Sequence, residues 1–336
     1  MTQIPRQPLF SGGPAVSRLC LGTMMFGDQT DEPESGRILE RFFAADGNFI
    51  DTADAYAGQE SEKILGRLLK DAPADVFVAT KVGNPVKGVE GSGGLSSDWI
   101  RRAAQMSRER LQRETIDLYY LHLDDERTPL EEVIGTLGGL ISEGVIRHWA
   151  FSNFRAWKIA EMIRIADSLG VPRPVAAQPY YHILNRQAEA DYLPACRHFG
   201  IGVVPYSPLG RGILTGKYRD GTPEGSRAAR GDARMMEVEF VPQTLALANR
   251  AADYAEGGGR EPAALAIRWV LANAGIPSVL IGPKSVKQLE GYLGAFETTY
   301  SVVDEAFLSG LCAPGQLPVA GHSDPRYPYR GRLPQL

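Results

Sequence analysis

The sequence predicts a single-domain TIM (β/α)8 barrel, and three observations lead to this prediction. Short apolar runs alternate with segments of helical periodicity through most of the chain, as expected for parallel βα units. The apolar runs show little polar alternation, which is typical of strands buried on both faces. Eight such units fit within 336 residues, with no change of composition that would mark a second domain. A doubly wound open sheet is the competing, less favoured interpretation.

Each expected strand is a short apolar run that ends at a polar residue or a turn. The strands are expected at 19–23, 49–51, 76–81, 116–122, 146–152, 175–178, 202–207 and 278–281. The helices between them are expected at 34–45, 61–70, 98–110, 129–143, 156–169, 189–199, 262–273 and 286–296. Thr128 followed by Pro129 is a helix-start signal, and Gly144 and Gly170 suit helix ends.

Three segments lie outside these units, within a single domain that covers residues 1–336 and has a core barrel at 16–312. The first residues, up to Ala15, are expected to form a hairpin that caps the bottom of the barrel. Residues 216–240, rich in Gly, Arg and Asp, are expected to form a long loop after the seventh strand, followed by an added helix at 243–255. The tail, 313–336, carries five prolines. Both long segments are expected to cover the substrate side.

Composition limits the functional class. With 36 basic and 40 acidic residues the net charge is -4, which argues against a nucleic-acid or anionic-membrane partner. The three scattered cysteines suggest neither a disulfide framework nor a zinc site. No signal peptide is apparent, and the most apolar stretch, 263–281, is interrupted by polar residues and a proline. We therefore expect a soluble cytoplasmic enzyme, of unknown oligomeric state.

Four polar residues stand at or just after the ends of successive predicted strands: Asp51, Tyr56, Lys81 and His122. In a parallel barrel these ends meet at the active site. A tyrosine is a poor acid because its pKa is about 10, but a nearby ammonium stabilises the phenolate and lowers the pKa. We hypothesise that Tyr56 protonates a carbonyl oxygen, that Lys81 and Asp51 tune it, and that His122 orients the carbonyl. Each residue taken alone also has a purely structural explanation, such as a buried ion pair.

These residues and further motifs resemble the aldo-keto reductases over nearly the whole chain. The motifs lie at 21–27 (LGTMMFG), 51–62 (DTADAYAGQESE), 121–125 (LHLDD), 151–154 (FSNF), 178–181 (QPYY) and 206–212 (YSPLGRG). The chain is most similar to the branch with bacterial reductases, aryl-alcohol dehydrogenases and potassium-channel β subunits. The resemblance implies a TIM barrel, no metal and an extended nicotinamide cofactor. No G-x-G-x-x-G motif opens a helix, which agrees with the absence of a Rossmann domain.

The resemblance also implies a set of cofactor-binding residues. Ser152, Asn153 and Gln178 match those that bind the nicotinamide carboxamide. Tyr206 matches the residue that stacks on the ring, and Ser207, Leu209 and Arg211 flank the pyrophosphate. The segment 281–288 (IGPKSVKQ) resembles the element that binds the adenosine 2′-phosphate, which favours NADP(H) over NAD(H). The complete implied set is Thr23, Ser152, Asn153, Gln178, Tyr206, Ser207, Pro208, Leu209, Gly210, Arg211, Lys217, Arg227, Ile281, Gly282, Lys284, Ser285 and Gln288.

The chain departs from the family pattern at Gly291 and Tyr292, where a Glu-Asn pair usually contacts adenine, so stacking on Tyr292 is an alternative. The resemblance implies NADP(H)-dependent reduction of an aldehyde or ketone, a small-molecule carbonyl substrate. The alternatives are a regulatory subunit that binds the cofactor and a partner protein with little turnover, and a lyase or isomerase. Arg326 or Arg330 would suit an acidic substrate group. Substrate-pocket candidates are Met25, Phe26, Asn84 and Trp149.

Overall fold

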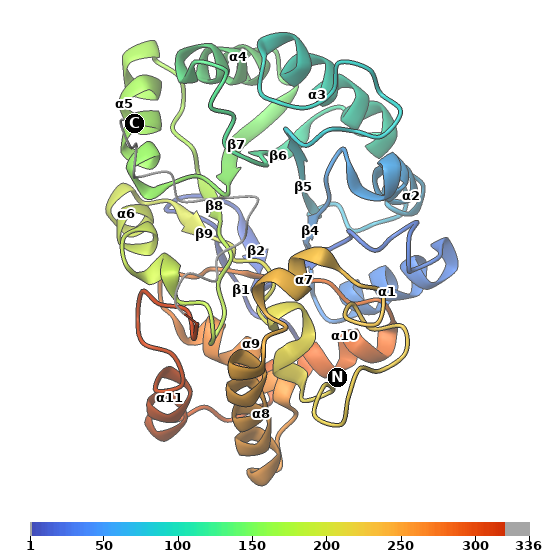
Figure 1. Cartoon of the computed structure of the whole chain (residues 1–336). Helices are drawn as coiled ribbons and strands as arrows, with labels where there is room; N and C mark the ends of the chain where they lie inside the picture. Colours follow the sequence, from blue (N-terminus) through green and yellow to red (C-terminus); the bar gives the residue numbers. More distant parts are fainter. Residues whose placement is uncertain (1, 320–336) are drawn as a thin grey trace.

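An eight-stranded parallel sheet forms the centre of the protein in the computed structural model, which describes residues 2–319 (Figure 1). Its strand order is β10-β3-β4-β5-β6-β7-β8-β9. The backbone N–H of Leu280 donates to the carbonyl of Pro205, just after β9, at 2.9 Å, so the two edges meet and the predicted barrel is confirmed. The strands are β3 (Leu19–Gly22), β4 (Phe49–Asp51), β5 (Phe77–Val82), β6 (Ile116–Leu121), β7 (Ile146–Ser152), β8 (Ala176–Gln178), β9 (Gly202–Val203) and β10 (Val279–Ile281).

Helices surround this sheet (Figure 1). Successive helices are in contact from α1 to α6 and from α8 to α10, and α10 returns to α1. The helix expected at 243–255 is α8. No helix within residues 2–319 is both long and apolar enough to cross a membrane. The α-helices are α1 (Glu32–Ala44), α2 (Glu60–Leu68), α3 (Ser97–Leu111), α4 (Leu130–Ser142), α5 (Ala156–Leu169), α6 (Tyr192–Phe199), α7 (Ala233–Val238), α8 (Pro242–Gly257), α9 (Pro262–Ala272), α10 (Val286–Leu293) and α11 (Val302–Ser309). Short 3-10 helices are η1 (Tyr56–Gln59), η2 (Gln187–Glu189), η3 (Gly210–Thr215) and η4 (Gly294–Phe296).

Side-chain caps define several helix ends. Asp31 accepts a hydrogen bond from the Glu34 N–H at the start of α1, and Ser285 does the same for Gln288 at the start of α10. These oxygens satisfy N–H groups that the helix itself leaves unpaired. At the other end of α5, Gly170 adopts a left-handed conformation with a φ of 65°, as its sequence position predicted.

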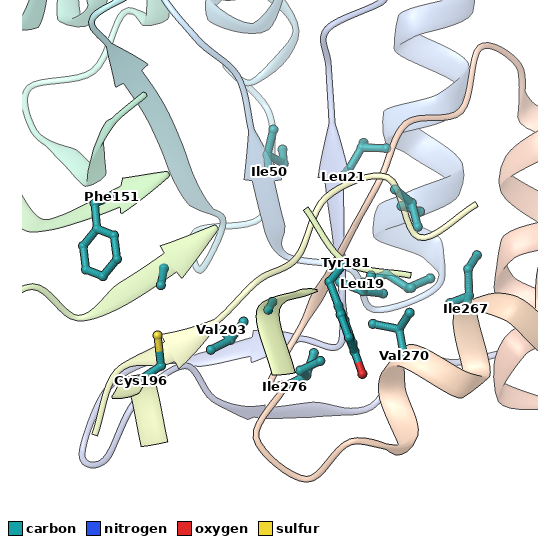
Figure 2. Packing of buried hydrophobic residues seen from close by; sticks show 14 of the residues in the cluster. Leu19, Leu21, Ile50, Phe151, Tyr181, Cys196, Val203, Ile267, Val270 and Ile276 are labelled. Carbon is teal, nitrogen blue, oxygen red and sulfur yellow. The ribbon is translucent and has the colours of Figure 1, made fainter. Parts of the chain in front are cut away.

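Two apolar clusters hold the barrel together. The larger one packs the strands against the helices; Leu19 and Leu21 of β3 lie in it with Ile267 and Val270 of α9 (Figure 2). The smaller one fills the barrel near the amino ends of the strands. It includes residues from the antiparallel hairpin of β1 (Arg6–Pro8) and β2 (Ala15–Ser17), so the expected hairpin caps the end of the barrel opposite the strand termini that carry the polar residues.

The structure corrects two local predictions. The seventh strand, β9, ends at Val203 rather than at residue 207; Pro205 has no N–H for the ladder, and beyond it Tyr206 forms an isolated bridge with Tyr180. Helix α4 begins at Leu130 with Pro129 as its N-cap, so the predicted start at Thr128 and Pro129 is displaced by one residue.

Of the two long segments, the first contains a helix that was not expected, and only the beginning of the second is described. The loop expected at 216–240 contains helix α7, whose N-cap Asp232 accepts a hydrogen bond from the Met235 N–H at 3.0 Å. In the tail, the described residues Ala313–Val319 pack near Arg186, whose N–H donates to the Gln316 carbonyl at 3.0 Å. The rest of the tail, with Arg326 and Arg330, lies outside the described residues.

Candidate active site

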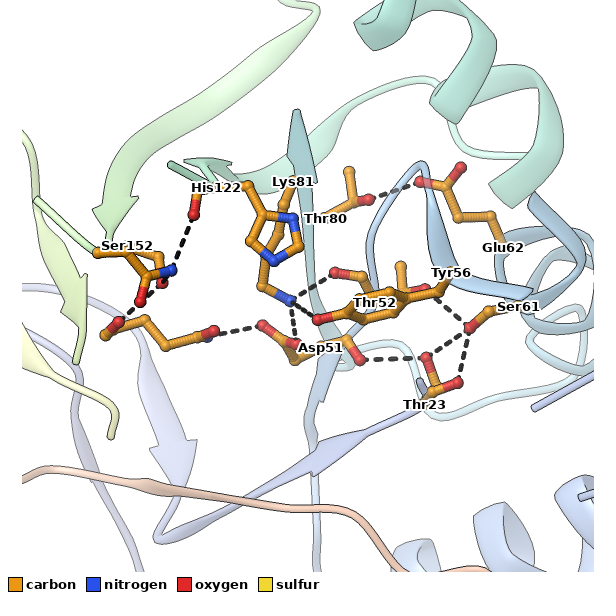
Figure 3. A network of polar contacts seen from close by, with 12 residues as sticks. Thr23, Asp51, Thr52, Tyr56, Ser61, Glu62, Thr80, Lys81, His122 and Ser152 are labelled. Carbon is orange, nitrogen blue, oxygen red and sulfur yellow. Dashed lines mark hydrogen bonds and ion pairs between the residues drawn. The ribbon is translucent and has the colours of Figure 1, made fainter. Parts of the chain in front are cut away.

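The ends of three neighbouring strands bring the four predicted catalytic residues together (Figure 3). Asp51 is the last residue of β4, Lys81 lies next to the end of β5, and His122 directly follows β6. Tyr56 begins the short helix η1 after β4. Because the register is parallel throughout, these positions lie at one end of the barrel, where a barrel enzyme carries its site.

The Lys81 ammonium is the centre of the cluster and is fully buried. It forms an ion pair with the Asp51 carboxylate and donates to the Thr52 carbonyl at 2.8 Å and to the Tyr56 hydroxyl at 3.2 Å. The other Asp51 oxygen accepts a hydrogen bond from the Gln178 amide at 2.9 Å. These contacts fix the direction in which the lysine faces the phenol.

The pKa values of Lys81 and Tyr56 follow from this arrangement. Burial lowers the pKa of Lys81, but the charge of Asp51 and its hydrogen bonds outweigh burial and raise the pKa above its usual value, so the ammonium stays charged. For Tyr56, burial raises the pKa and Lys81 only partly opposes this. Lys81 and, more weakly, Arg234 lower the pKa of Tyr56, but burial outweighs them, so the expected net lowering is wrong and the net shift of the pKa is upward. The phenol keeps its proton at neutral pH.

His122 lies beside Tyr56, with ring centroids 5.8 Å apart in an edge-to-face arrangement. Burial, and then the positive charges of Lys81 and Arg234, hold the pKa of His122 well below its usual range. The ring is therefore neutral and has one N–H to donate. Within residues 2–319 its Nδ1 has no hydrogen-bond partner, and its side chain lines a cavity.

A second layer of acids lies behind the cluster. Glu62 is fully buried and accepts hydrogen bonds from Thr80 at 2.5 Å and from Arg110 at 2.7 Å (Figure 3). Burial and the negative charge of Glu62 raise the pKa of Asp54 to about 8. Asp54 is thus largely protonated at neutral pH, so that Asp51 is the carboxylate that pairs with Lys81.

A cavity of about 1060 Å³ lies over these residues, and most of the predicted site residues line it. Asp51, Tyr56 and His122 line it, whereas Lys81 lies beneath them. Two predicted cofactor residues, Thr23 and Gly210, are buried outside the cavity lining; the Thr23 hydroxyl contacts Ser61 at 2.8 Å. The predicted cofactor residues that do line it are Ser152, Asn153, Gln178, Tyr206, Ser207, Pro208, Leu209, Arg211, Lys217, Arg227, Ile281, Gly282, Lys284, Ser285 and Gln288.

Polar groups near His122 are arranged around the Tyr206 ring. The Tyr206 hydroxyl donates to Asn153 Oδ1 at 2.9 Å, and Asn153 Nδ2 donates to the His122 carbonyl at 2.9 Å. Ser152 Oγ donates to the Gln178 carbonyl at 2.8 Å. An aromatic face bordered by amide and hydroxyl groups suits a planar ring that carries a primary amide.

Behind Tyr206 lies a group that we name the Glu239 clasp: Tyr180, Arg211 and Glu239. Tyr180 stacks on Tyr206 with centroids 5.2 Å apart and donates its hydroxyl to Glu239. Arg211 Nη1 lies 2.6 Å from the same carboxylate, and the Arg211 guanidinium lies 4.9 Å from the Tyr180 ring. Arg211 therefore forms a buried ion pair in addition to lining the cavity, and Glu239 ties the end of α7 to the barrel. No motif in the sequence pointed to Glu239.

Several cations lie close together at one part of the cavity lining. Burial, and then the charges of Arg230, Arg227 and Lys217, lower the pKa of Lys284 to about 8. The pKa of Lys217 is also lowered, by burial and by two of these arginines. Ser285 stands at the N-cap of α10 beside Lys284. A polyanion placed among these groups would relieve their repulsion, so this end fits the phosphates of a dinucleotide.

The cavity lining also decides between the pocket candidates and adds residues. Met25 and Asn84 line the cavity as expected. Phe26 and Trp149 are fully buried core residues, so their expected place in the pocket is wrong. Arg234 of α7 lines the cavity although no motif singled it out. The sequence did contain one signal for α7: Asp232 is a residue type that suits a helix N-cap, and in the structure it accepts a hydrogen bond from the Met235 N–H three residues later.

A closed parallel barrel with an acid–base cluster and a cofactor-sized cavity at the carboxyl ends of its strands defines an enzyme. The model of the Aldo/keto reductase family matches residues 18–306, and the chain belongs to this family.

Known proteins similar to this chain agree with that assignment. An uncharacterized oxidoreductase of Bacillus subtilis, YrpG, is 34% identical over 296 residues, which is 85% of this chain and 89% of that protein. A probable voltage-gated potassium channel subunit beta of rice is 32% identical over 87% of this chain and 92% of its own length. The mouse aflatoxin B1 aldehyde reductase member 2 is 33% identical over 88% and 84%. The family and these relatives identify the chain as an oxidoreductase.

Proposed function

We propose that the protein is an NADP(H)-dependent reductase that converts an aldehyde or ketone to an alcohol, with Tyr56 as the general acid. The contact that carries the proposal is the 3.2 Å hydrogen bond from Lys81 to Tyr56, at the base of a cavity that His122 also lines. The mouse relative, named for reduction of an aldehyde, supports a carbonyl substrate.

The cavity lining fits a nicotinamide dinucleotide. Ser152, Asn153 and Gln178 would hold the carboxamide, and the Tyr206 ring would support the nicotinamide. Lys217, Arg227 and Lys284 would bind phosphates at the other end, and their crowding favours the additional 2′-phosphate of NADP(H). When bound, the cofactor supplies the hydride that reduces the carbonyl carbon.

The protein's own groups handle the carbonyl oxygen. The neutral His122 ring donates an N–H to this oxygen and orients it toward Tyr56. Tyr56 gives up its hydroxyl proton as negative charge develops on the oxygen, and the Lys81 ammonium stabilises the resulting phenolate. Asp51 keeps the ammonium in position. General acid catalysis of this kind accelerates a reaction by about 10² to 10⁴.

The test is NADPH consumption, followed by absorbance, with a panel of small aldehydes. We expect turnover by the parent and its collapse in Tyr56→Phe. The matched control is Tyr300→Phe, which removes a hydroxyl that bonds Glu305 on the surface, outside the cavity lining. Near-full activity of Tyr56→Phe would exclude Tyr56 as the acid.

A second candidate, a cofactor-binding regulatory subunit with little turnover, is suggested by the rice relative, which is named as a channel subunit. The same assay separates the two. Tight NADPH binding without turnover of any panel member would favour the regulatory function, and saturable turnover would exclude it.

A further inference from the structure

The strand order of the closed barrel separates the catalytic residues from the cations proposed to bind phosphates. In the ring of eight strands, β5 stands opposite β9, and β6 stands opposite β10. His122 follows β6, whereas Lys284 follows β10 and Lys217 lies in the loop beyond β9. A side chain placed just after β5 therefore lies on the catalytic side of the barrel mouth, across from these cations.

Asn84 is such a side chain, and the backbone that leads to it is fixed beside β6. The Val82 carbonyl accepts a hydrogen bond from the His122 N–H at 2.8 Å, and the Gly83 carbonyl accepts one from the Gly94 N–H at 2.8 Å. Gly83 has a φ of 132°, a conformation that favours glycine, so the chain changes direction immediately before Asn84. Asn84 is thus held close to His122, and both side chains line the same cavity.

The Asn84 amide is available to a molecule bound in the cavity. Its side chain is half-buried, and within residues 2–319 it has no hydrogen-bond partner. A primary amide can both donate and accept, so it can bind a hydroxyl group or a carbonyl oxygen. An analogue that lacks such a group would leave the amide unpaired, which is how a polar side chain in a binding site discriminates between substrates.

The other cavity-lining residues that follow β3 and β4 give Tyr56 an uncharged surrounding. Met24 and Met25 follow β3, so they lie on the opposite side of β4 from Asn84. Both oxygens of the Asp51 carboxylate are already engaged, one in an ion pair and one in a hydrogen bond. A carbonyl compound bound at Tyr56 would therefore place apolar atoms against the methionines and a neutral polar group against Asn84.

We propose that Asn84 is a specificity-determining residue and that the substrate class is neutral carbonyl compounds with an oxygen on the carbon next to the carbonyl group. This inference rests on the proposed reductase function, in which His122 orients the carbonyl. Asn84 stands two residues beyond the backbone hydrogen bond to His122, so the oxygen that it binds lies close to the reacting group.

The experiment compares two aldehydes of nearly equal size, 2-hydroxypropanal and 2-methylpropanal, in which a methyl group replaces the hydroxyl. Values of kcat/KM with NADPH are measured for the parent, Asn84→Leu and Asn84→Ser. The matched control, Asn249→Leu, changes a half-buried amide of α8 that does not line the cavity. The quantity to compare is the hydroxyl-to-methyl ratio of kcat/KM, because the hydration of each aldehyde is the same for all variants and cancels between them.

We expect the parent to prefer the hydroxy aldehyde, and the ratio to fall about 3- to 10-fold in Asn84→Leu, the range for losing a hydrogen bond between neutral groups. Asn84→Ser keeps a donor and acceptor and should retain part of the preference, and Asn249→Leu should retain all of it. The dissociation constant for NADPH, from fluorescence titration, should not change in Asn84→Leu.

Several results would overturn the inference. An unchanged ratio in Asn84→Leu would show that the amide does not meet the hydroxyl, and equal losses on both aldehydes would indicate a role in holding the loop after β5. A weaker affinity for NADPH would place Asn84 at the cofactor. Turnover of other aldehydes by the parent, but not of 2-hydroxypropanal, would exclude the proposed substrate class, whereas no turnover of any aldehyde would instead overturn the proposed reductase function.

Discussion

Replacing Lys81 by methionine tests the proton-transfer cluster most directly, because one side chain contacts both Asp51 and Tyr56. The substitution keeps most of the buried volume and removes the ammonium that lies 3.2 Å from the phenol oxygen. Coulomb's law with an effective dielectric constant of about 20 gives roughly 5 kcal/mol of phenolate stabilisation at this distance. If about half to most of this is felt in the transition state, kcat should fall by about 10²- to 10⁴-fold.

The assay follows the pH dependence of both directions of the reaction. If Tyr56 is the acid, as proposed, it accepts a proton in alcohol oxidation, so the rate should rise with pH along a limb that reports the Tyr56 pKa. Without Lys81 this pKa rises further, because burial and the negative charge of Asp51 are then unopposed by the ammonium. We therefore expect the limb to move to higher pH in Lys81→Met, together with the fall in kcat.

Stability must be separated from catalysis in this experiment. Removing one partner of a buried ion pair costs about 3 to 5 kcal/mol, because Asp51 is left as an unpaired charge. The double variant Asp51→Asn, Lys81→Met removes both charges and should recover much of the unfolding free energy without recovering kcat. A folded Lys81→Met protein that keeps kcat within threefold of the parent from pH 6 to 9 would refute the reasoning.

Three further outcomes follow from the buried charges. Glu239→Gln should weaken the hold of Arg211 on α7 and raise the NADPH dissociation constant several-fold; an unchanged constant in fluorescence titration would contradict a role for the clasp in shaping the site. Since the Lys284 pKa is about 8, its charge is lost above that pH, and NADPH affinity should fall between pH 7 and 9 in the parent but less in Lys284→Met, as calorimetry would show. The folded-state pKa of Asp54, about 8, lies above its unfolded value, so the contribution of Asp54 to stability is lost as pH rises from about 4 to 8. The free energy of unfolding, measured by urea denaturation, should therefore drop between pH 5 and 8.5, and this drop should be at least about 1 kcal/mol smaller in Asp54→Asn. An equal drop in both proteins would count against this explanation.

The barrel and the four candidate catalytic residues could be predicted from the sequence because both depend on local patterns. Apolar runs without alternation identify strands covered on both faces, and a polar residue at the end of such a run must lie at one end of the barrel. Asp51, Lys81 and His122 satisfy this rule and lie together in the structure. The limit of the seventh strand was missed because Pro205 interrupts a run that is otherwise apolar.

The parts that were not predicted depend on contacts between distant segments. Glu239 and Arg211 are 28 residues apart, and nothing local in either stretch shows that they pair. The net pKa shift of Tyr56 was also missed, because burial of the phenol results from the whole barrel and not from its neighbours in sequence. Arg234 lines the cavity because α7 forms within a segment that composition alone describes as a loop.

The strand ends carry the candidate proton-transfer residues and a loop segment carries Arg234, and this separation has a consequence for how such enzymes diversify. The proposed proton-transfer groups lie at the ends of strands or in the short helix that follows β4, whereas Arg234 is carried on a loop segment fastened through Glu239. Surface segments tolerate replacement far better than barrel strands. We expect that exchanging only α7, residues 233–238, for another sequence, with Lys217, Arg227 and Glu239 kept, would redirect the enzyme to different carbonyl compounds while the proposed acid and phosphate ligands stayed intact. Substrate range could then change, in evolution or by engineering, without a change in the residues proposed to transfer the proton.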